Sequence, residues 1–209
     1  MNFKAFIFDL DGTVFDTSLD LAAAVNRMRI YYDLETLDTQ TIVSHLGDGA
    51  FKLVERSLKG TLIDPHTAVK VFLDFYDEDI CIKTDFYPGM REFLEELKER
   101  NLPAGILTNK PQDPTDKLID TLGVRDLFQF AYGPDNFGKK PDPNGLNECV
   151  KILGLPKDQV LMIGDHHTDL YAANDAGVKN VYVTYGFGRI GESRVDYKID
   201  KCEELFKFL

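Results

Sequence analysis

The pattern of apolar and polar residues divides the chain into a short opening strand, a helical region and a long alternating region. Residues 4–8, Lys-Ala-Phe-Ile-Phe, form a mostly apolar run typical of strands that are buried on both faces. From about residue 16 to residue 86, apolar residues recur at helical spacing and no strand alternation is visible. From residue 87 onwards, short apolar runs alternate with helical stretches. This order predicts an α/β fold: a Rossmann-like parallel sheet with helices on both faces, and an inserted all-helical segment.

The spacing also predicts where individual elements lie. In the helical region we expect a helix over about residues 18–32, two shorter helices on either side of Gly47-Asp48-Gly49, and a longer one over about residues 64–82. In the alternating region, the expected strands cover residues 103–108, 129–132, 160–164 and 180–184, and a last helix covers 202–209. We therefore expect a core of residues 1–15 and 87–209. Residues 16–86 would form a helical domain that can act as a lid over the end of the first strand.

Composition and charge narrow the class of protein. Of the 209 residues, 44% are hydrophobic and 28% are charged, as in ordinary globular enzymes. A formal net charge of −11, without any run of lysine or arginine, argues against a nucleic-acid partner. The three cysteines are far apart, the start does not resemble a signal peptide, and no apolar run approaches the ~20 residues of a membrane span. We expect a cytoplasmic protein without a membrane partner, either a monomer or a homodimer.

Two carboxylates one residue apart follow the opening strand. Asp9 and Asp11 lie there, with Gly12 and Thr13 close behind them. Open α/β sheets bind their ligands at the carboxyl ends of parallel strands, and Gly12 would let the backbone approach a ligand closely. Carboxylate oxygens are ligands that Mg²⁺ prefers, so this segment predicts a site for Mg²⁺ and phosphate. The alternative is an Asx-type turn that closes the strand, since Asp and Gly are turn residues.

Three later segments also place polar residues after strands or before a proline. Thr108 and Asn109 follow one predicted strand. Lys140 precedes a proline, and Asp165 follows another predicted strand. A hydroxyl and backbone amides can hold phosphate, an ammonium can counter its charge, and a further carboxylate can complete an oxygen shell for Mg²⁺. Taken singly, each segment has a structural alternative: a capping turn, or a solvated lysine pair.

Taken together and in this order, the four segments resemble the four motifs of the haloacid dehalogenase superfamily, and most closely those of phosphoglycolate phosphatases and their relatives. The segments are Phe8-Asp9-Leu10-Asp11-Gly12-Thr13, Thr108-Asn109-Lys110, Lys139-Lys140-Pro141-Asp142-Pro143 and Gly164-Asp165-His166-His167-Thr168-Asp169. In the helical region, Gly47-Asp48-Gly49 resembles the Gly-x-Gly substrate loop of phosphoglycolate phosphatases, although a turn between two helices explains it as well. The resemblance covers nearly the whole chain and implies that residues 16–86 are a helical cap.

The resemblance implies a role for each matching residue. Asp9 would be the nucleophile that forms an aspartyl-phosphate, and Asp11 the general acid and base. Thr108 would hold the phosphate, and Lys140 would contact both the nucleophile and the phosphate. The implied ligands of the Mg²⁺ cofactor are Asp9, Asp11 and Asp165, with Asp169 as an outer ligand. The implied phosphate- and substrate-binding residues are Gly12, Thr108, Asn109, Lys140, Gly47 and Gly49.

Four side chains depart from the family pattern or remain open. Many relatives carry a small residue where this chain has His166, so we expect changed contacts beside the metal. His166 and His167 suggest zinc, but adjacent histidines point in different directions and no HxxxH or thiolate partner accompanies them, which disfavours zinc. Lys110 either belongs to the Thr-Asn-Lys-Pro form common in phosphoglycolate phosphatases or is a surface lysine. Asp48 would repel a substrate carboxylate if it pointed inward, which weighs against phosphoglycolate as the substrate.

The combined motifs predict a Mg²⁺-dependent phosphatase that hydrolyses a small, phosphoglycolate-like phosphomonoester through an aspartyl-phosphate. Its expected partner is therefore a small phosphorylated metabolite. The same core would also suit a phosphosugar mutase similar to β-phosphoglucomutase, or a pyrophosphatase. A non-catalytic phosphate-binding protein is the remaining alternative. It predicts a missing motif residue, whereas all of them are present.

Overall fold

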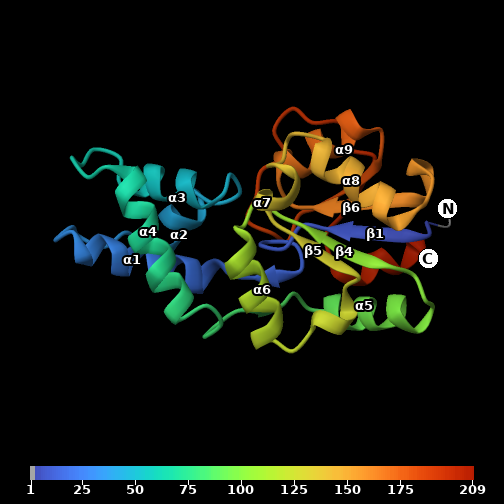
Figure 1. Cartoon of the computed structure of the whole chain (residues 1–209), viewed down its shortest axis with the longest axis horizontal. Helices are drawn as coiled ribbons and strands as arrows, with labels where there is room; N and C mark the ends of the chain where they lie inside the picture. Colours follow the sequence, from blue (N-terminus) through green and yellow to red (C-terminus); the bar gives the residue numbers. More distant parts are fainter. Residues whose placement is uncertain (1–2) are drawn as a thin grey trace.

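The centre of the molecule is a parallel sheet. The computed structural model describes residues 3–209. Its main sheet has six strands, and each neighbouring pair is parallel. The strands are β1 (Ala5–Phe8), β4 (Ala104–Leu107), β5 (Phe130–Tyr132), β6 (Val160–Gly164), β7 (Lys179–Val183) and β8 (Tyr197–Ile199). They lie in the order β5-β4-β1-β6-β7-β8, so β1 runs between β4 and β6 (Figure 1). The expected α/β fold is confirmed.

Helices cover both faces of this sheet, which explains why β1 is apolar throughout. Its side chains alternate between two clusters, because successive residues of a strand point to opposite faces. Phe6 and Phe8 pack on the face of α5 (Met90–Glu99), where the rings of Phe6 and Phe93 meet edge to face at 5.6 Å. Ala5 and Ile7 face α8 (Asn144–Leu153) and α9 (His167–Ala176). Figure 1 shows α8 and α9 on one side of the sheet and α5 on the other.

The strand register brings three of the predicted motifs to one edge of the sheet. Phe8 of β1 lies opposite Ile106 of β4 and Ile163 of β6. Because the three strands are parallel neighbours, the residues that follow them emerge side by side. This is the edge at which open α/β sheets bind ligands, on either side of the strand where the order reverses.

Four helices lie between β1 and the rest of the sheet in sequence, and together they form the helical insertion (Figure 1). The helices are α1 (Ser18–Tyr31), α2 (Thr39–Val43), α3 (Ala50–Ser57) and α4 (Pro65–Glu78). A short antiparallel ribbon of β2 (Phe15–Asp16) and β3 (Asp85–Phe86) joins them to the core. The remaining helices are α6 (Gln112–Thr121), α7 (Pro134–Phe137) and three 3₁₀ turns, the last over Cys202–Phe208.

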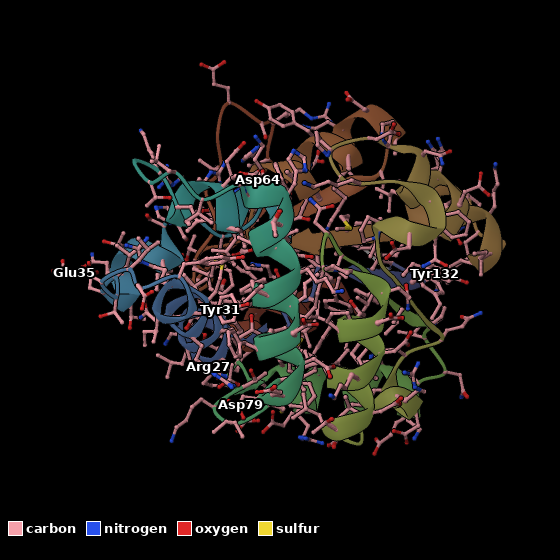
Figure 2. All side chains as sticks on the ribbon, turned by 60° about the vertical axis from the view of Figure 1, so that its left-hand side comes forward. Arg27, Tyr31, Glu35, Asp64, Asp79 and Tyr132 are labelled. Carbon is pink, nitrogen blue, oxygen red and sulfur yellow. The ribbon has the colours of Figure 1, made fainter. Side chains whose placement is uncertain are left out.

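Helix α4 lies against α1 and α3 and extends from the insertion towards the core. Figure 2 shows it lengthwise, with Asp64 at its beginning and Asp79 at its end. Asp64 caps the helix by accepting a hydrogen bond from the His66 amide at 3.0 Å. At the other end, Arg27 of α1 forms ion pairs with Glu78 at 2.5 Å and Asp79 at 2.6 Å. These contacts fix the long helix at both ends.

The sequence-based elements are wrong at three places. Residues 16–86 are not wholly helical, because Asp16 and Asp85–Phe86 belong to the β2–β3 ribbon. The edge strand β8 was not predicted, and the expected last helix is a 3₁₀ helix. Strands of two residues, such as β2 and β3, are too short for an alternating pattern to distinguish them from loop. Within residues 3–209, no helix combines the length and the apolar composition that crossing a membrane requires.

Candidate active site

Asp9 and Lys140 form a buried ion pair at the end of β1. The Lys140 ammonium donates hydrogen bonds to Asp9 Oδ1 at 2.8 Å, to Asp169 Oδ1 at 2.6 Å and to the Leu107 carbonyl at 2.6 Å. Each of the three ammonium protons therefore has an acceptor, and a contact with a further group would replace one of these hydrogen bonds. Burial by itself would lower the pKa of Lys140, but the two carboxylates raise it above its usual value. Burial raises the pKa of Asp9 to about 6, because it outweighs the attraction of Lys140.

Asp9 also belongs to a cluster of three buried carboxylates. One oxygen each from Asp9, Asp165 and Asp169 lies within 4.8 Å of the others. Asp165 Oδ2 accepts hydrogen bonds from the amides of Phe187 at 3.0 Å and Gly188 at 2.7 Å. Burial, together with the neighbouring carboxylates, raises the pKa of Asp165 above its usual value. Lys140 offsets only part of the negative charge of the three carboxylates. The atoms that could bind a metal are all oxygens, so the cluster fits a divalent cation of the Mg²⁺ type.

Gly12 and the segment after β7 close tightly around the cluster. Gly12 has a φ of +84°, and a Cβ there would lie 2.2 Å from Asp165 Oδ2. A Cβ at Gly186 would lie 2.2 Å from the Gly12 carbonyl, and one at Gly188 2.5 Å from the Asp165 carbonyl. This second segment was not among the site residues predicted from the sequence. Its Gly-x-Gly spacing directly after a predicted strand was the signal that could have found it.

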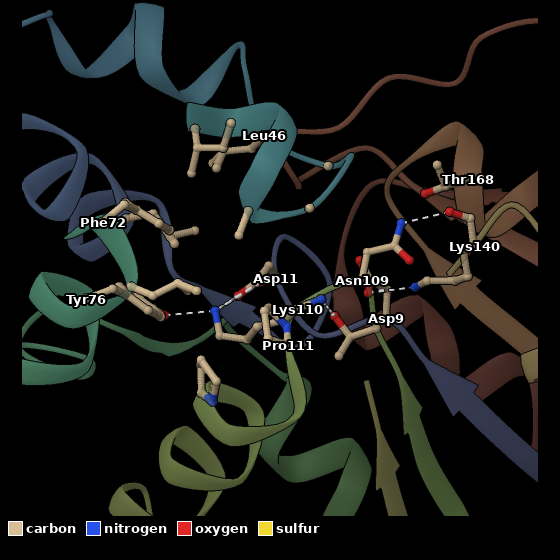
Figure 3. Close-up of a pocket in the computed structure, with 18 of the residues that line it drawn as sticks. Asp9, Asp11, Leu46, Phe72, Tyr76, Asn109, Lys110, Pro111, Lys140 and Thr168 are labelled. Atoms are coloured by element: carbon tan, nitrogen blue, oxygen red, sulfur yellow. Dashed lines mark hydrogen bonds and ion pairs between the residues drawn. The ribbon is translucent and has the colours of Figure 1, made fainter. Parts of the chain in front are cut away.

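Asp11 lies apart from that cluster and pairs with Lys110. The Lys110 ammonium donates to Asp11 at 3.0 Å and 3.2 Å and to the Tyr76 hydroxyl of α4 at 2.9 Å (Figure 3). Lys110 is only 6% exposed, so the surface-lysine interpretation is wrong. Burial alone would lower the pKa of Lys110, but Asp11 raises it above its usual value. The prediction that the Asp11 carboxylate is itself a metal ligand gains no support from this pairing and stays a prediction.

Thr108 and Asn109 are buried between these two lysines. The Thr108 hydroxyl accepts a hydrogen bond from the Lys110 amide at 3.2 Å. The Asn109 amide donates to the Lys140 carbonyl at 2.9 Å, as Figure 3 shows. The Thr-Asn-Lys segment thus links the carboxylate cluster to Asp11.

A cavity of about 50 Å³ lies between this polar floor and the helical insertion (Figure 3). Asp9, Asp11, Thr108, Lys110 and Lys140 line its polar side. The side formed by the insertion is mainly apolar, with Leu21, Leu46, Leu53, Phe72 and Leu73, and it includes Gly47 and Gly49. Asn109 of the core also lines the cavity. The predicted residues Gly12, Asp165 and Asp169 are not part of this lining. The cavity therefore joins charged groups of the core to an apolar roof.

The Gly47-Asp48-Gly49 loop lies against the core. Gly47 has a φ of +101°, and a Cβ there would lie 2.4 Å from the His166 ring. The Lys139 ammonium donates a hydrogen bond to the Asp48 carbonyl, while the Asp48 carboxylate pairs with Arg56 at 2.5 Å. The carboxylate is not among the groups that line the active-site cavity, so it does not oppose a substrate carboxylate there.

His166 ends its strand by capping α9. Its ring accepts a hydrogen bond from the Thr168 amide at 3.5 Å, and its own amide donates to Asp169 at 3.1 Å. Burial lowers the pKa of His166 to about 4, with His167 contributing to the shift. The expectation that the two histidines point in different directions is wrong, because their ring centroids lie 4.0 Å apart.

Comparison with known proteins gives the family. Residues 6–183 match the haloacid dehalogenase-like hydrolase family. This chain belongs to that family. It is 35% identical to a phosphoglycolate phosphatase of Colwellia psychrerythraea, with 99% of this chain and 95% of the relative covered. A phosphoglycolate phosphatase of Chromobacterium violaceum is 34% identical, with 99% and 96% covered.

Solved structures agree with this family. The crystal structure of a predicted phosphoglycolate phosphatase from Haemophilus somnus is similar with a TM-score of 0.92 and 28% identity, and the similarity covers 99% of this chain and 98% of that one. The sequence-based identification of a haloacid dehalogenase-type phosphatase, similar to phosphoglycolate phosphatases, is confirmed. The chain is thus an enzyme of the phosphoric monoester hydrolase class.

Proposed function

We propose that this enzyme hydrolyses a small phosphomonoester in the cavity between the core and the helical insertion, with Asp9 as the nucleophile. The position of Asp9 carries the proposal. Its Oδ1 accepts from Lys140, which leaves the other oxygen for attack, and it lies at the floor of the cavity. The Lys140 ammonium partly offsets the effect of burial, so that Asp9, with a pKa of about 6, is mainly ionised at neutral pH, as a nucleophile requires.

In the first step, an oxygen of Asp9 forms a bond to phosphorus while the ester P–O bond breaks. Asp11 gives its proton to the leaving oxygen, so that the alcohol departs neutral. In the second step, Asp11 takes a proton from a water molecule as the water oxygen attacks phosphorus. The bond between Asp9 and phosphorus breaks and inorganic phosphate leaves.

The phosphate oxygens would be held by the Thr108 hydroxyl, the Lys140 ammonium and the backbone around Gly12 and Asn109. A bound Mg²⁺, held by Asp9 and Asp165 with Asp169 behind them, would neutralise charge on the phosphate. Residues 16–86 would act as the cap, whose apolar residues exclude water from the cavity.

Phosphoglycolate is the first substrate to test, because relatives that are 35% and 34% identical to this chain are named phosphoglycolate phosphatases. The test is phosphate release from phosphoglycolate, sugar phosphates, aryl phosphates and pyrophosphate, with Mg²⁺ and with EDTA. We expect metal-dependent release from a monoester. Isomerisation of a sugar phosphate, or activity restricted to pyrophosphate, would favour a mutase or a pyrophosphatase instead.

The role of Asp9 has its own test. Asp9→Asn keeps the size of the side chain and removes the nucleophilic oxygen, so we expect a folded protein without measurable turnover. Asp113→Asn, an exposed change on α6, is the matched control and should retain activity. Turnover near the wild-type rate in Asp9→Asn would rule out the aspartyl-phosphate route.

A further inference from the structure

We propose that Asp48, His166 and His167 form a second metal site, selective for a transition metal of the Zn²⁺ type, where the helical insertion meets the core. We call these three residues the seam cluster. The proposal does not depend on the identity of the phosphatase substrate. The seam cluster is separate from the carboxylate cluster of Asp9, Asp165 and Asp169.

The ligand atoms of the seam cluster lie close enough together to bind one metal ion. One ligand atom from each seam-cluster residue lies within 4.8 Å of the other two. His167 Nε2 and Asp48 Oδ1 are 3.8 Å apart. Tetrahedral Zn²⁺ with ligand bonds near 2.1 Å places its ligand atoms about 3.4 Å apart, so this pair needs to close by only about 0.4 Å. Rotation of partly exposed side chains supplies a movement of that size.

Neighbouring side chains orient the ligand atoms of Asp48 and His166. Arg56 binds Asp48 Oδ2 at 2.5 Å, which leaves Oδ1 turned towards His167. The Thr168 hydroxyl lies 3.1 Å from His166 Nδ1, and in the tautomer that donates the Nδ1 proton to this hydroxyl, Nε2 is unprotonated on the side of Gly47. Metal binding would select this tautomer over the one in which Nδ1 accepts from the Thr168 amide at 3.5 Å. Metal-binding histidines commonly hold their second ring nitrogen in such a hydrogen bond, which fixes the ring. The cluster thus has its supporting contacts in place.

The ligand atoms of the seam cluster favour a transition metal over Mg²⁺. Two imidazole nitrogens and one carboxylate oxygen suit Zn²⁺ and other late transition metals, whereas Mg²⁺ prefers oxygen ligands alone. The carboxylate cluster offers only oxygens and the seam cluster offers mainly nitrogen. The two clusters should therefore select different metals.

The surroundings leave room for a fourth ligand. The seam cluster opens into a cavity of about 380 Å³, which Arg56, Lys59 and Arg189 also line. A water molecule or a small anion can complete the coordination there, and the three cationic side chains favour the anion. Three protein ligands with one open position are the usual arrangement of a zinc site that exchanges its fourth ligand.

The experiment measures Zn²⁺ binding to the full chain by titration calorimetry, with Mg²⁺ in large excess so that the carboxylate cluster is saturated. Co²⁺ serves as a spectroscopic probe, since its visible absorption is much stronger in tetrahedral than in octahedral coordination. We expect one equivalent of Zn²⁺ to bind in the presence of Mg²⁺, and one equivalent of Co²⁺ to give the tetrahedral spectrum.

Three variants assign the binding. His167→Asn and Asp48→Asn should each weaken Zn²⁺ binding at least about tenfold and remove the Co²⁺ spectrum, because each removes a ligand. His66→Asn, an exposed histidine at the start of α4, is the matched control and should bind as the wild type does. Asp9→Asn, altered in the carboxylate cluster, should also retain the binding. Zn²⁺ binding that Mg²⁺ displaces, that Asp9→Asn abolishes, or that His167→Asn leaves unchanged would overturn the proposal.

Discussion

Lys140 joins Asp9, the proposed nucleophile, to Asp169 of the same carboxylate cluster through a single ammonium. Its three protons meet two carboxylates and one carbonyl, and the side chain is buried. A buried ammonium is stable only with such partners, and the carboxylates in turn depend on it for charge compensation. Lys140 thus keeps Asp9, at the floor of the cavity, close to Asp169.

Replacing Lys140 by methionine should lower kcat about 10²- to 10³-fold, the loss typical of removing one charge-stabilising donor from an active site. Methionine keeps much of the chain length but cannot hold Asp9 or the phosphate. Steady-state kinetics on the best substrate measure the effect. Lys151→Met on the exposed side of α8 should keep the wild-type kcat, and an unchanged kcat in Lys140→Met would contradict the assigned role.

At the scale of elements, α4 reaches from the insertion to Lys110, the partner of Asp11, which is the proposed general acid and base. Its Tyr76 hydroxyl accepts from Lys110, which holds Asp11. The contact forms only while α4 lies against the Thr-Asn-Lys segment. The orientation of Asp11 therefore depends on the position of a helix in the proposed cap.

Tyr76→Phe should lower kcat/KM by about two- to tenfold, the equivalent of one hydrogen bond of about 0.5–1.5 kcal/mol. The ring is retained, so the apolar packing of α4 stays intact. Tyr31→Phe, on an exposed side chain, provides the comparison. Equal kcat/KM values in the two variants would show that the Tyr76 hydroxyl does not act on Asp11.

The first turn of α1 is tied to the segment that returns to the core. Buried Asp20 accepts hydrogen bonds from the Lys83 amide at 3.0 Å, the Thr84 amide at 2.9 Å and the Thr84 hydroxyl at 2.7 Å. Asp20→Ala should lower the free energy of unfolding by about 1–3 kcal/mol, because buried donors lose their acceptor. Urea unfolding measures this against Asp74→Ala, an exposed change on α4. No difference between the two would contradict the role of Asp20.

The sequence was informative where a pattern is local and less so where contacts join distant residues. Buried parallel strands such as β1 and β6 are continuous apolar runs, and the acids that follow them could be placed from sequence. The ribbon of β2 and β3 could not, because two residues carry no periodicity. Lys110 remained open because its partners, Asp11 and Tyr76, come from other elements. The seam cluster was missed for the same reason, since Asp48 approaches the histidines only in the folded chain.

At the scale of the whole molecule, the insertion and the core meet on two sides of the Gly47-Asp48-Gly49 loop. On one side lies the active-site cavity, and on the other lies the cavity of the seam cluster. Lys139 and Arg189 of the core add hydrogen bonds to the carbonyls of Asp48 and Ser44. A metal ion at the seam cluster would add bonds between the same two parts and oppose their separation.

Zn²⁺ should therefore slow turnover at saturating Mg²⁺ if product release requires the proposed cap to open. His167→Asn should need at least about tenfold more Zn²⁺ for the same inhibition, in line with the weaker binding expected there. Phosphate release at increasing Zn²⁺, with His66→Asn as the comparison, measures this. Equal inhibition of the wild type, His167→Asn and His66→Asn would place the inhibitory ion in the active site instead.

The helical insertion leaves the core and returns to it at adjacent residues, because Phe15 lies opposite Phe86 in the β2–β3 ribbon. A segment with paired ends can grow, shrink or be exchanged in evolution while the strands on either side keep their positions. Under the proposed function, the stretch that selects the substrate and the stretches that perform the chemistry can therefore change independently. A descendant of this enzyme could acquire a new substrate through changes between residues 17 and 84 and inherit its catalytic acids unaltered.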